Sequence, residues 1–282
     1  MQTIENLKKT LGGIDTQILE TIKKRIEITN QIGTLKIKTG EPMFVPEQER
    51  KMLDSLSKRF DADIFGIESM WREIMYISKR EQQKLKQTNK NTITIGIQGG
   101  KGSFNDIAIA NFLDKNSFDK EVKIEYLYTT EAVLESLNSG AIDYGQFALA
   151  NSIGGIVEET ITGLGAYRWT QVENYHIPVK HSLLLHPNAS IDSIDTIMGH
   201  EQAIQQCKTN LTKMYPHCKK IGGTDLLTDN ASIAEAVANG TLPKTTAAIG
   251  HESLASLYNL KIHKKNIQDQ NDNQTTFVLV KL

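Results

Sequence analysis

The stretch IENLKKTLGGIDTQILETIKKRIEITNQIGTLK, residues 4–36, is the longest periodic run of the chain and decides the fold of its N-terminal part. Apolar residues recur at two heptad positions and form one stripe along a helix. They are Ile4, Leu11, Ile18 and Ile32 at the first position and Leu7, Ile14, Ile28 and Leu35 at the second. The run contains no proline, and Gly12-Gly13 weakens a helix only locally. We therefore expect one long helix over residues 4–38.

A cation stands where this stripe requires an apolar residue. Arg25 occupies the next heptad position, and a buried guanidinium is costly unless an anion meets it. Lys36 lies about 20° further around the helix and about 16 Å along it, so the two side chains can hold the ends of a small dianion. Lys8 lies about 25 Å from Arg25 along the axis and reaches such a site only from a second copy of the chain. The alternative is an amphipathic helix whose arginine extends to solvent or pairs with a glutamate.

Length and composition indicate a globular protein with two domains. The chain has 282 residues, 39% of them hydrophobic, and a net charge of −1, which favours neither nucleic acid nor a membrane as partner. No apolar run approaches the roughly 20 residues that span a bilayer, and the N-terminus has no signal-peptide pattern. Cys207 and Cys218 give neither a metal spacing nor a disulfide framework, so we expect a cytoplasmic protein without a metal or cofactor.

Residues 1–87 are expected to form an all-helical domain of three helices. A second helix begins at Pro46 and ends near Phe60, and a third begins after Asp61 or Asp63 and ends near Leu85. The third helix has an apolar side made of Ile64, Ile67, Met70, Trp71, Ile74 and Ile77. Because these helices cannot enclose a core alone, we expect two copies to interlace as a homodimer, and residues 1–90 to dimerise and act without the rest.

Strands and helices alternate in residues 92–282, after a polar linker, KQTNKNT, at 86–92. This alternation is typical of an α/β domain, in which ligands bind at the carboxyl ends of strands. Expected strands cover residues 92–98, 122–128, 144–150, 181–185, 246–250 and 276–282. Expected helices cover residues 106–114, 131–139, 202–214, 233–239 and 252–258.

Polar segments lie at the ends of three of these strands. GIQGGKGSFND (96–106) puts Ser103 at a helix N-terminus, and its glycine spacing matches neither nucleotide-binding fingerprint. ANSIGG (150–155) offers Asn151 and Ser152 between a strand and a helix, and NQTTF (273–277) puts Thr275 just before the last strand. Each segment alone is a common turn, but together they describe a site for an anionic, oxygen-rich ligand.

Taken together, these motifs resemble those of bifunctional chorismate mutase–prephenate dehydratases. Arg25, GTLK ending at Lys36, PEQERKML and the pair Ser78 and Gln82 are similar to the all-helical chorismate mutases. By this resemblance Arg25 and Lys36 bind the carboxylates and ether oxygen of the substrate, Gln82 binds the ether oxygen, Ser78 a carboxylate and Glu49 the ring hydroxyl. Lys8, from the partner chain, and Gln48 stand where the family usually or often has arginine, and both would bind substrate.

The C-terminal part is similar to prephenate dehydratases in five motifs, which are GGKGSFN, ANSIGG, GHEQAIQQC, TAAIG and NQTTF. The resemblance implies a two-lobed fold like that of periplasmic binding proteins, with Thr275 as the catalytic proton donor. It implies substrate binding by Ser103, Phe104, Asn151, Ser152, His200 and Phe277. The substrates implied are chorismate and prephenate.

The chain departs from the dehydratase pattern at Ala150, Gly199, Glu201 and Thr276, where the family has Glu, Ser, Pro and Arg. The arginine is the expected clamp on a substrate carboxylate, so its replacement by Thr276 predicts weaker prephenate binding. The sequence stops at Leu282, directly after the last motif, and an ACT-type regulatory domain is therefore not expected.

We expect a chorismate mutase in residues 1–87 and a prephenate dehydratase in residues 92–282. Two alternatives for the C-terminal part stay open. One is altered prephenate chemistry, such as decarboxylation without loss of the hydroxyl. The other is a module that binds an aromatic precursor without turnover.

Overall fold

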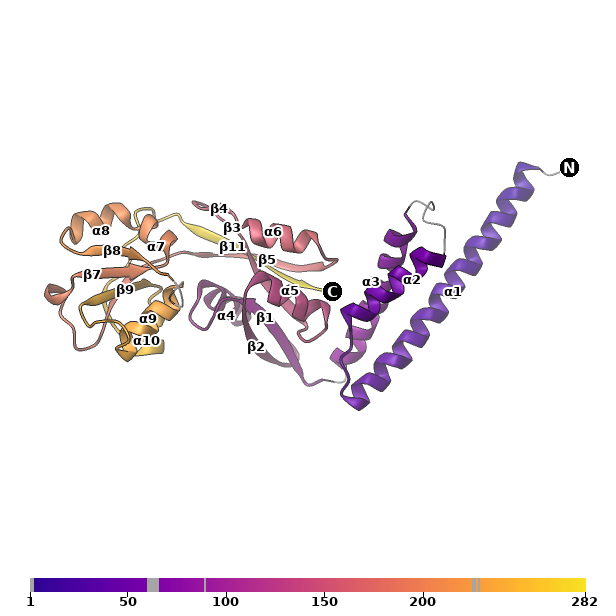
Figure 1. Cartoon of the computed structure of the whole chain (residues 1–282), viewed down its shortest axis with the longest axis horizontal. Helices are drawn as coiled ribbons and strands as arrows, with labels where there is room; N and C mark the ends of the chain where they lie inside the picture. Colours follow the sequence, from indigo (N-terminus) through magenta and orange to yellow (C-terminus); the bar gives the residue numbers. More distant parts are fainter. Residues whose placement is uncertain (1–2, 60–65, 89, 225–226, 228) are drawn as a thin grey trace.

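A computed structural model describes residues 3–59, 66–88, 90–224, 227 and 229–282, and it has an elongated helical part beside a two-lobed α/β part (Figure 1). The helices of the first part are α1 (Ile4–Thr39), α2 (Pro46–Arg59) and α3 (Ile67–Thr88). The three predicted helices are confirmed, although Phe60 and the expected caps Asp61 and Asp63 lie outside the described residues. The third helix runs on to Thr88, where a linker was expected from Lys86. None of the described helices combines the length and apolar character that crossing a membrane requires.

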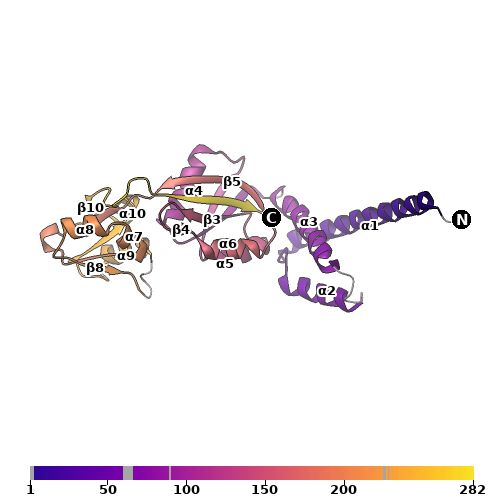
Figure 2. The same cartoon turned by 90° about the horizontal axis from the view of Figure 1, so that it is seen from above.

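The apolar stripe of α1 lies on the surface of the single chain. Ile4 is 75% exposed, Ile18 48% and Leu35 61%, and Gly33 is the buried residue of this helix. Figure 2 shows the N-terminal half of α1 extending away from the rest of the molecule. On α3, Ile74 is buried as expected, but Met70 is 50% exposed. One chain therefore does not bury the apolar surface that its heptads create.

The first lobe of the α/β part is a sheet covered by three helices. Its strand order is β2-β1-β3-β11-β5, and β4 pairs with β3. The elements are β1 (Thr92–Gln98), β2 (Glu121–Tyr128), β3 (Tyr144–Asn151), β4 (Gly155–Ile156), β5 (Thr170–Pro178), β11 (Gln274–Lys281), α4 (Phe104–Lys115), α5 (Thr130–Asn138) and α6 (Glu158–Gly165). The core of this lobe holds Phe147, Phe277 and the fully buried isoleucines of β1.

The second lobe is a five-stranded sheet of order β10-β6-β9-β7-β8. Its elements are β6 (Ser182–Leu185), β7 (Thr196–Gly199), β8 (Lys219–Gly222), β9 (Thr246–Gly250), β10 (Lys261–Lys264), α7 (Glu201–Gln206), α8 (Lys208–Met214), α9 (Asn230–Asn239), α10 (Ser253–Tyr258) and a short 3-10 helix (Ile191–Ser193). The single helix expected over residues 202–214 is wrong, because the chain breaks at Cys207 into α7 and α8.

The chain crosses between the lobes twice. It leaves the first lobe after Pro178 and returns at Gln274, so β11 lies antiparallel between β3 and β5. Thr275 is thus the second residue of β11 and pairs with Asn151, although the sequence pattern placed it before the strand. ANSIGG does not lead directly into a helix either, because Gly155 first pairs back onto Asn151.

The helical part packs against the first lobe. Met43 and Phe44, between α1 and α2, belong to the same buried hydrophobic cluster as Val133 and Leu137 of α5. Side-chain hydrogen bonds reinforce the contact, among them Tyr76 to Thr170 at 3.0 Å, Lys79 to Asn138 at 3.0 Å and Gln83 to the Asp143 carbonyl at 3.3 Å. The two parts therefore share one core.

Candidate functional sites

A cavity of about 150 Å³ opens between the three helices. It brings together six of the seven residues predicted for a site in this part, which are Arg25, Lys36, Gln48, Glu49, Ser78 and Gln82. They come from α1, α2 and α3, and the packing of these helices brings the six side chains to one cavity. The seventh, Lys8, is exposed near the far end of α1 and does not line this cavity within one chain.

Arg25 is half-buried and faces the cavity. Its Nη1 donates a 2.7 Å hydrogen bond to the Ser78 hydroxyl, and its guanidinium lies 5.7 Å from the ring centroid of Trp71. Burial lowers the pKa of Arg25 from its ordinary value. Within the described ranges no carboxylate lies at ion-pair distance from it. Among the described residues, Arg25 therefore has no glutamate partner, and its cation is held in place by neutral groups.

Lys36 of α1 and Gln82 of α3 line the same cavity. The Lys36 ammonium donates to the Met43 carbonyl at 3.1 Å, and the buried Gln82 amide donates to the Thr29 carbonyl. An ammonium has three donors and a primary amide has two, so each group retains a proton for a ligand. The described residues also leave Lys36 without an ion pair. The cavity therefore presents two cations and an amide to an anionic ligand.

Lys79 is a cavity residue that the sequence reasoning missed. Its ammonium forms a 2.7 Å ion pair with Glu49 and lies 5.6 Å from the ring centroid of Phe44. The signal was present in the helix periodicity, because Lys79 lies four residues after Met75, a lining residue on the same face of α3.

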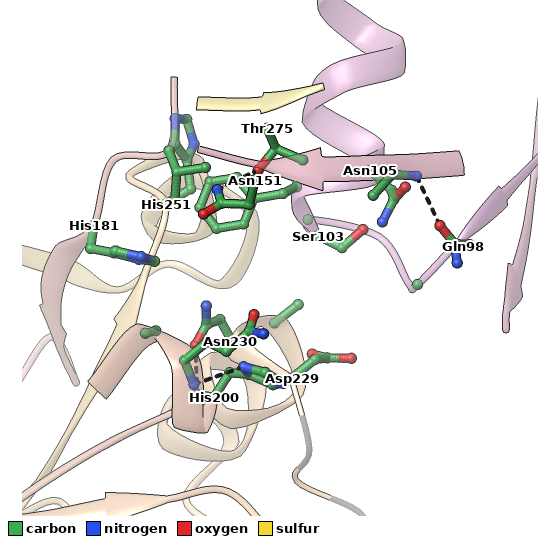
Figure 3. A pocket seen from close by; sticks show the side chains of 18 of the residues that line it. Gln98, Ser103, Asn105, Asn151, His181, His200, Asp229, Asn230, His251 and Thr275 are labelled. Carbon is green, nitrogen blue, oxygen red and sulfur yellow. Dashed lines mark hydrogen bonds between the residues drawn. The ribbon is translucent and has the colours of Figure 1, made fainter. Parts of the chain in front are cut away.

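A second cavity, of about 370 Å³, lies between the two lobes of the α/β part (Figure 3). Six of the seven residues predicted for this part line it, which are Ser103, Phe104, Asn151, His200, Thr275 and Phe277. Ser152 is not among the lining residues. Its hydroxyl instead accepts a 2.9 Å hydrogen bond from the Gln274 backbone N–H and so ties the β3–β4 turn to β11.

Asn151 and Thr275 form the most sharply defined contact in this cavity. The Asn151 carbonyl oxygen accepts hydrogen bonds from the backbone N–H groups of Ile153 and Gly154, which fixes the direction of its amide. The Asn151 Nδ2 then donates to Thr275 Oγ1 at 3.0 Å and to Asn273 Oδ1 at 2.6 Å. Because Thr275 accepts in this contact, its own hydroxyl proton is free to be donated to a ligand.

The glycine-rich turn that carries Gly102 and Ser103 also lines this cavity. Gly102 has φ +83°, and a Cβ there would lie 2.5 Å from Leu254 of the second lobe, so only glycine fits. Ser103 caps α4 by accepting from the Asp106 N–H at 3.3 Å, while Asp106 accepts from the Gly102 N–H at 2.8 Å. One turn N–H is therefore already occupied by a carboxylate.

Three histidines line the cavity, and only His200 was predicted. The Nδ1 atoms of His200 and His251 each accept a backbone N–H at 3.2 Å, so the neutral rings carry their proton on Nε2. His181 is buried, and its Nε2 donates to the Gln206 carbonyl oxygen at 2.9 Å. Its Nδ1 is then an acceptor without a partner among the described residues. Burial lowers the pKa of both His181 and His251.

Both of these histidines lie at strand ends, where the chain enters β6 and leaves β9. The rule that ligands bind at the carboxyl ends of strands would have found His251. His181 lies at the amino end of β6, which reaches the same edge of the sheet because β6 runs antiparallel to β9.

The described lining of this cavity contains neither lysine nor arginine. Thr276 does not face it, because Thr275 and Phe277 do and successive side chains of a strand point to opposite faces. Thr276 pairs instead with Ala150 on β3 and His176 on β5. The expectation that Thr276 removes a charge from the ligand pocket is therefore corrected. Two of the four departures from the family pattern, Ala150 and Thr276, are direct neighbours across the sheet.

Comparisons with known proteins divide the chain at the same place as the fold. Residues 95–282 match the prephenate dehydratase family, and residues 7–83 match the type II chorismate mutase family. Similar curated proteins are the bifunctional chorismate mutase/prephenate dehydratases of Enterobacter agglomerans and Aquifex aeolicus. They are 25% and 26% identical over 97% and 99% of this chain, which correspond to 71% and 73% of the relatives.

Solved structures resemble the α/β part. A prephenate dehydratase from Arthrobacter aurescens in complex with L-Phe has a TM-score of 0.58 and 21% identity, and GqqA, described as a novel type of quorum quenching acylase, has 0.54 and 22%. Each covers 67% of this chain, which spans 60% and 63% of the two structures. At this identity they support the two-lobed fold alone, which confirms the fold that the sequence predicted.

Proposed function

The chain belongs to the prephenate dehydratase family and carries a type II chorismate mutase domain in front, and we propose on this basis that it catalyses two consecutive steps of phenylalanine biosynthesis. The helical part converts chorismate to prephenate. The cavity between the lobes converts prephenate to phenylpyruvate. The two proposed reactions use neither a metal nor a cofactor.

One observation carries the mutase assignment: Arg25 and Lys36 reach the same cavity, and no carboxylate pairs with them among the described residues. The rearrangement is pericyclic, so the enzyme must hold the enolpyruvyl arm over the ring and stabilise charge at the ether oxygen. Lys36 and Gln82 donate to that oxygen, while Arg25 and Ser78 bind a carboxylate. Glu49 accepts from the ring hydroxyl, its charge being balanced by Lys79.

A second copy of the chain completes this site in the proposal. The exposed stripe of α1 is an apolar surface of the kind that a twofold-related helix covers. The cavity within one chain, about 150 Å³, is below the roughly 300 Å³ of ordinary ligand pockets. Lys8 of the second copy then closes it, opposite Gln48.

In the dehydratase step, the bond between the ring and its carboxylate breaks and releases CO2. Its electron pair enters the ring and expels the hydroxyl at the opposite carbon, which leaves as water after taking one proton. Thr275 donates that proton and regains it from solvent, and Asn151 holds its oxygen in place.

A second reading has one observation in its favour. Because the described lining has neither lysine nor arginine and includes the carboxylate of Asp229, a dianionic substrate meets no permanent positive side-chain charge there. This surrounding also suits a decarboxylation that retains the hydroxyl. Product identity distinguishes the two, because phenylpyruvate has lost the hydroxyl and the decarboxylated product has not.

Arg25→Ala is expected to lower the mutase kcat/KM by about a hundredfold or more, because it removes a charge from a site for a dianion. Arg25→Lys keeps the charge but loses the planar donors and should fall in between. Lys24→Ala, on the exposed neighbour in the same helix, is the control and should match wild type. Retention of more than a tenth of wild-type turnover by Arg25→Ala would make this side chain merely structural.

Ile18→Glu is expected to give a monomer without mutase activity, because it places a carboxylate in the stripe that a second copy covers. Thr16→Glu adds the same charge about 200° away around the helix and should leave the dimer intact. Sedimentation velocity gives the mass and a chorismate assay gives the rate. A monomeric Ile18→Glu with wild-type turnover would contradict the shared site.

Thr275→Val is expected to lower kcat for prephenate by about a hundredfold or more while the protein stays folded, because the isosteric side chain has no proton to donate. Thr276→Val, one residue on and on the other face of the strand, is the matched control and should retain activity. If the two substitutions had equal effects on kcat, Thr275 would not be the proton donor.

The dehydratase kcat/KM is expected to rise as pH falls from 8 toward 5. With no lysine or arginine in the described lining, positive charge comes from imidazoles, and burial keeps the pKa of His251 below 6.5. The imidazole of His251 therefore becomes protonated only as the pH falls through this lowered pKa. Glu252 and Lys180 are the charged neighbours of this ring.

The pH profile is measured on wild type, His251→Gln and His217→Gln, with the uncatalysed conversion of prephenate subtracted at each pH. Glutamine keeps a donor but does not titrate, so His251→Gln should flatten the rise. His217 is exposed and outside the cavity, so its variant should follow wild type. A wild-type profile that rises toward alkaline pH would contradict the assignment.

A further inference from the structure

The wall of the helical cavity is shared with the α/β part. Met43 and Phe44 line the cavity, and both are almost fully buried, with 8% and 6% exposure. Most of the partners in their hydrophobic cluster come from the first lobe, among them Val133, Leu137 and Ile142. The segment that closes one side of the mutase cavity is therefore held by residues of the other domain.

Gly140, just after α5, determines how closely Phe44 can approach. Its φ is +71°, and a Cβ there would lie 2.8 Å from Phe44 Cε2 and 3.0 Å from Cδ2. The ring thus rests against the bare backbone of the turn. The Gly140 carbonyl also accepts a hydrogen bond from Lys86, so the turn is tied to α3 as well.

Asn138, the last residue of α5, reaches the cavity through Lys79. The Lys79 ammonium donates to Asn138 Oδ1 at 3.0 Å and pairs with Glu49 at 2.7 Å. Two of its three protons are therefore directed by groups on different domains. Without Asn138, the ammonium would be free to leave the position that balances the charge of Glu49.

The same wall also holds the proposed catalytic cation. Lys36 donates to the Met43 carbonyl at 3.1 Å, and the side chain of Met43 is buried with that of Phe44 in the shared cluster. A displacement of Phe44 would move this carbonyl and with it the ammonium. The turn after α5 is thus connected to Lys36 through Phe44 and Met43, and to Glu49 through Lys79.

We propose that Asn138 and Gly140 of the dehydratase domain are positioning residues for the mutase reaction, acting through Lys79 and Phe44. The proposal rests on the proposed mutase activity. It means that the helical part reaches full activity only while it is docked on the domain to which it is fused. Neither residue lines the cavity between the lobes, so the second reaction should not depend on them.

The test uses the full-length protein and follows both reactions in each variant. Asn138→Leu removes the acceptor at nearly constant size and should lower the mutase kcat/KM about tenfold. Asn138→Asp keeps an acceptor for Lys79 and should stay within about threefold of wild type. In a Lys79→Met background, Asn138→Leu should have no further effect, because the residue through which it acts is gone.

Gly140→Ala tests the contact with Phe44 and should lower the mutase kcat/KM by about tenfold or more. Gly240→Ala is its matched control, because Gly240 has a similar φ of +80° but nothing within 4 Å of the added Cβ. Turnover of prephenate within about twofold of wild type shows that the first lobe of each variant is folded.

Four outcomes decide the matter. A selective loss of mutase activity in Asn138→Leu and Gly140→Ala, rescued by Asn138→Asp, supports the positioning role. Mutase activity equal to that of Gly240→Ala in both variants overturns it. Equal loss of both activities also overturns it, because the turn would then be needed only for folding. A wild-type protein that leaves chorismate unchanged overturns the proposed mutase function, and this role with it.

Discussion

A half-buried guanidinium with no counter-ion in the described part of the chain constrains the helical part of this protein. Arg25 is held by the Ser78 hydroxyl and the face of Trp71, and the described residues place no carboxylate beside it. Desolvating a cation costs free energy that neutral contacts offset only in part. An anionic ligand would supply the missing interaction. Lys36, on the same helix, donates to the Met43 carbonyl and has no ion pair among the described residues, so it gives such a ligand a second point of attachment.

In the proposed function both cavities bind prephenate, but the charged groups that line them differ. In the helical cavity the positive charge is permanent, because it belongs to arginine and lysine. In the cavity between the lobes, the described lining offers imidazoles, amides, hydroxyls and the carboxylate of Asp229, so positive side-chain charge there depends on pH. Prephenate is the product of the first cavity and the substrate of the second. Because ionic attraction in the second cavity is weak, prephenate binding there depends more on shape complementarity and on hydrogen bonds, among them those that Asn151 organises.

Much of the fold follows from local patterns. The heptads of residues 4–36 predict α1, and alternating apolar runs predict β1, β3 and β9 to within a residue. The pattern does not reveal β5, because TQVENYHIP is polar at most positions and lies exposed at the sheet edge. Short strands such as β8 and β10 carry lysines and have no apolar run to mark them.

The site residues show the same division. Arg25 stands out because it interrupts an apolar stripe. Thr275 and Asn151 stand out because they belong to polar motifs at strand ends. Lys79 is less evident, because its partners Glu49 and Asn138 come from other helices. His251 directly follows β9, so its place at a strand end was a signal that the sequence offered. The heptads also predict that residues 1–90 act alone. This stays a prediction. The structure adds a contact that no periodicity encodes, because Phe44 packs on a turn almost a hundred residues away.

Incubation of the wild-type protein with chorismate at neutral pH, with products identified by ultraviolet absorbance and mass, tests the central claim most directly. The account predicts that chorismate disappears, prephenate rises and falls, and phenylpyruvate accumulates. Chorismate that stays unchanged would contradict the assignment of the helical cavity. Prephenate that persists, or yields a decarboxylated product still carrying its hydroxyl, would contradict the dehydratase assigned to the cavity between the lobes.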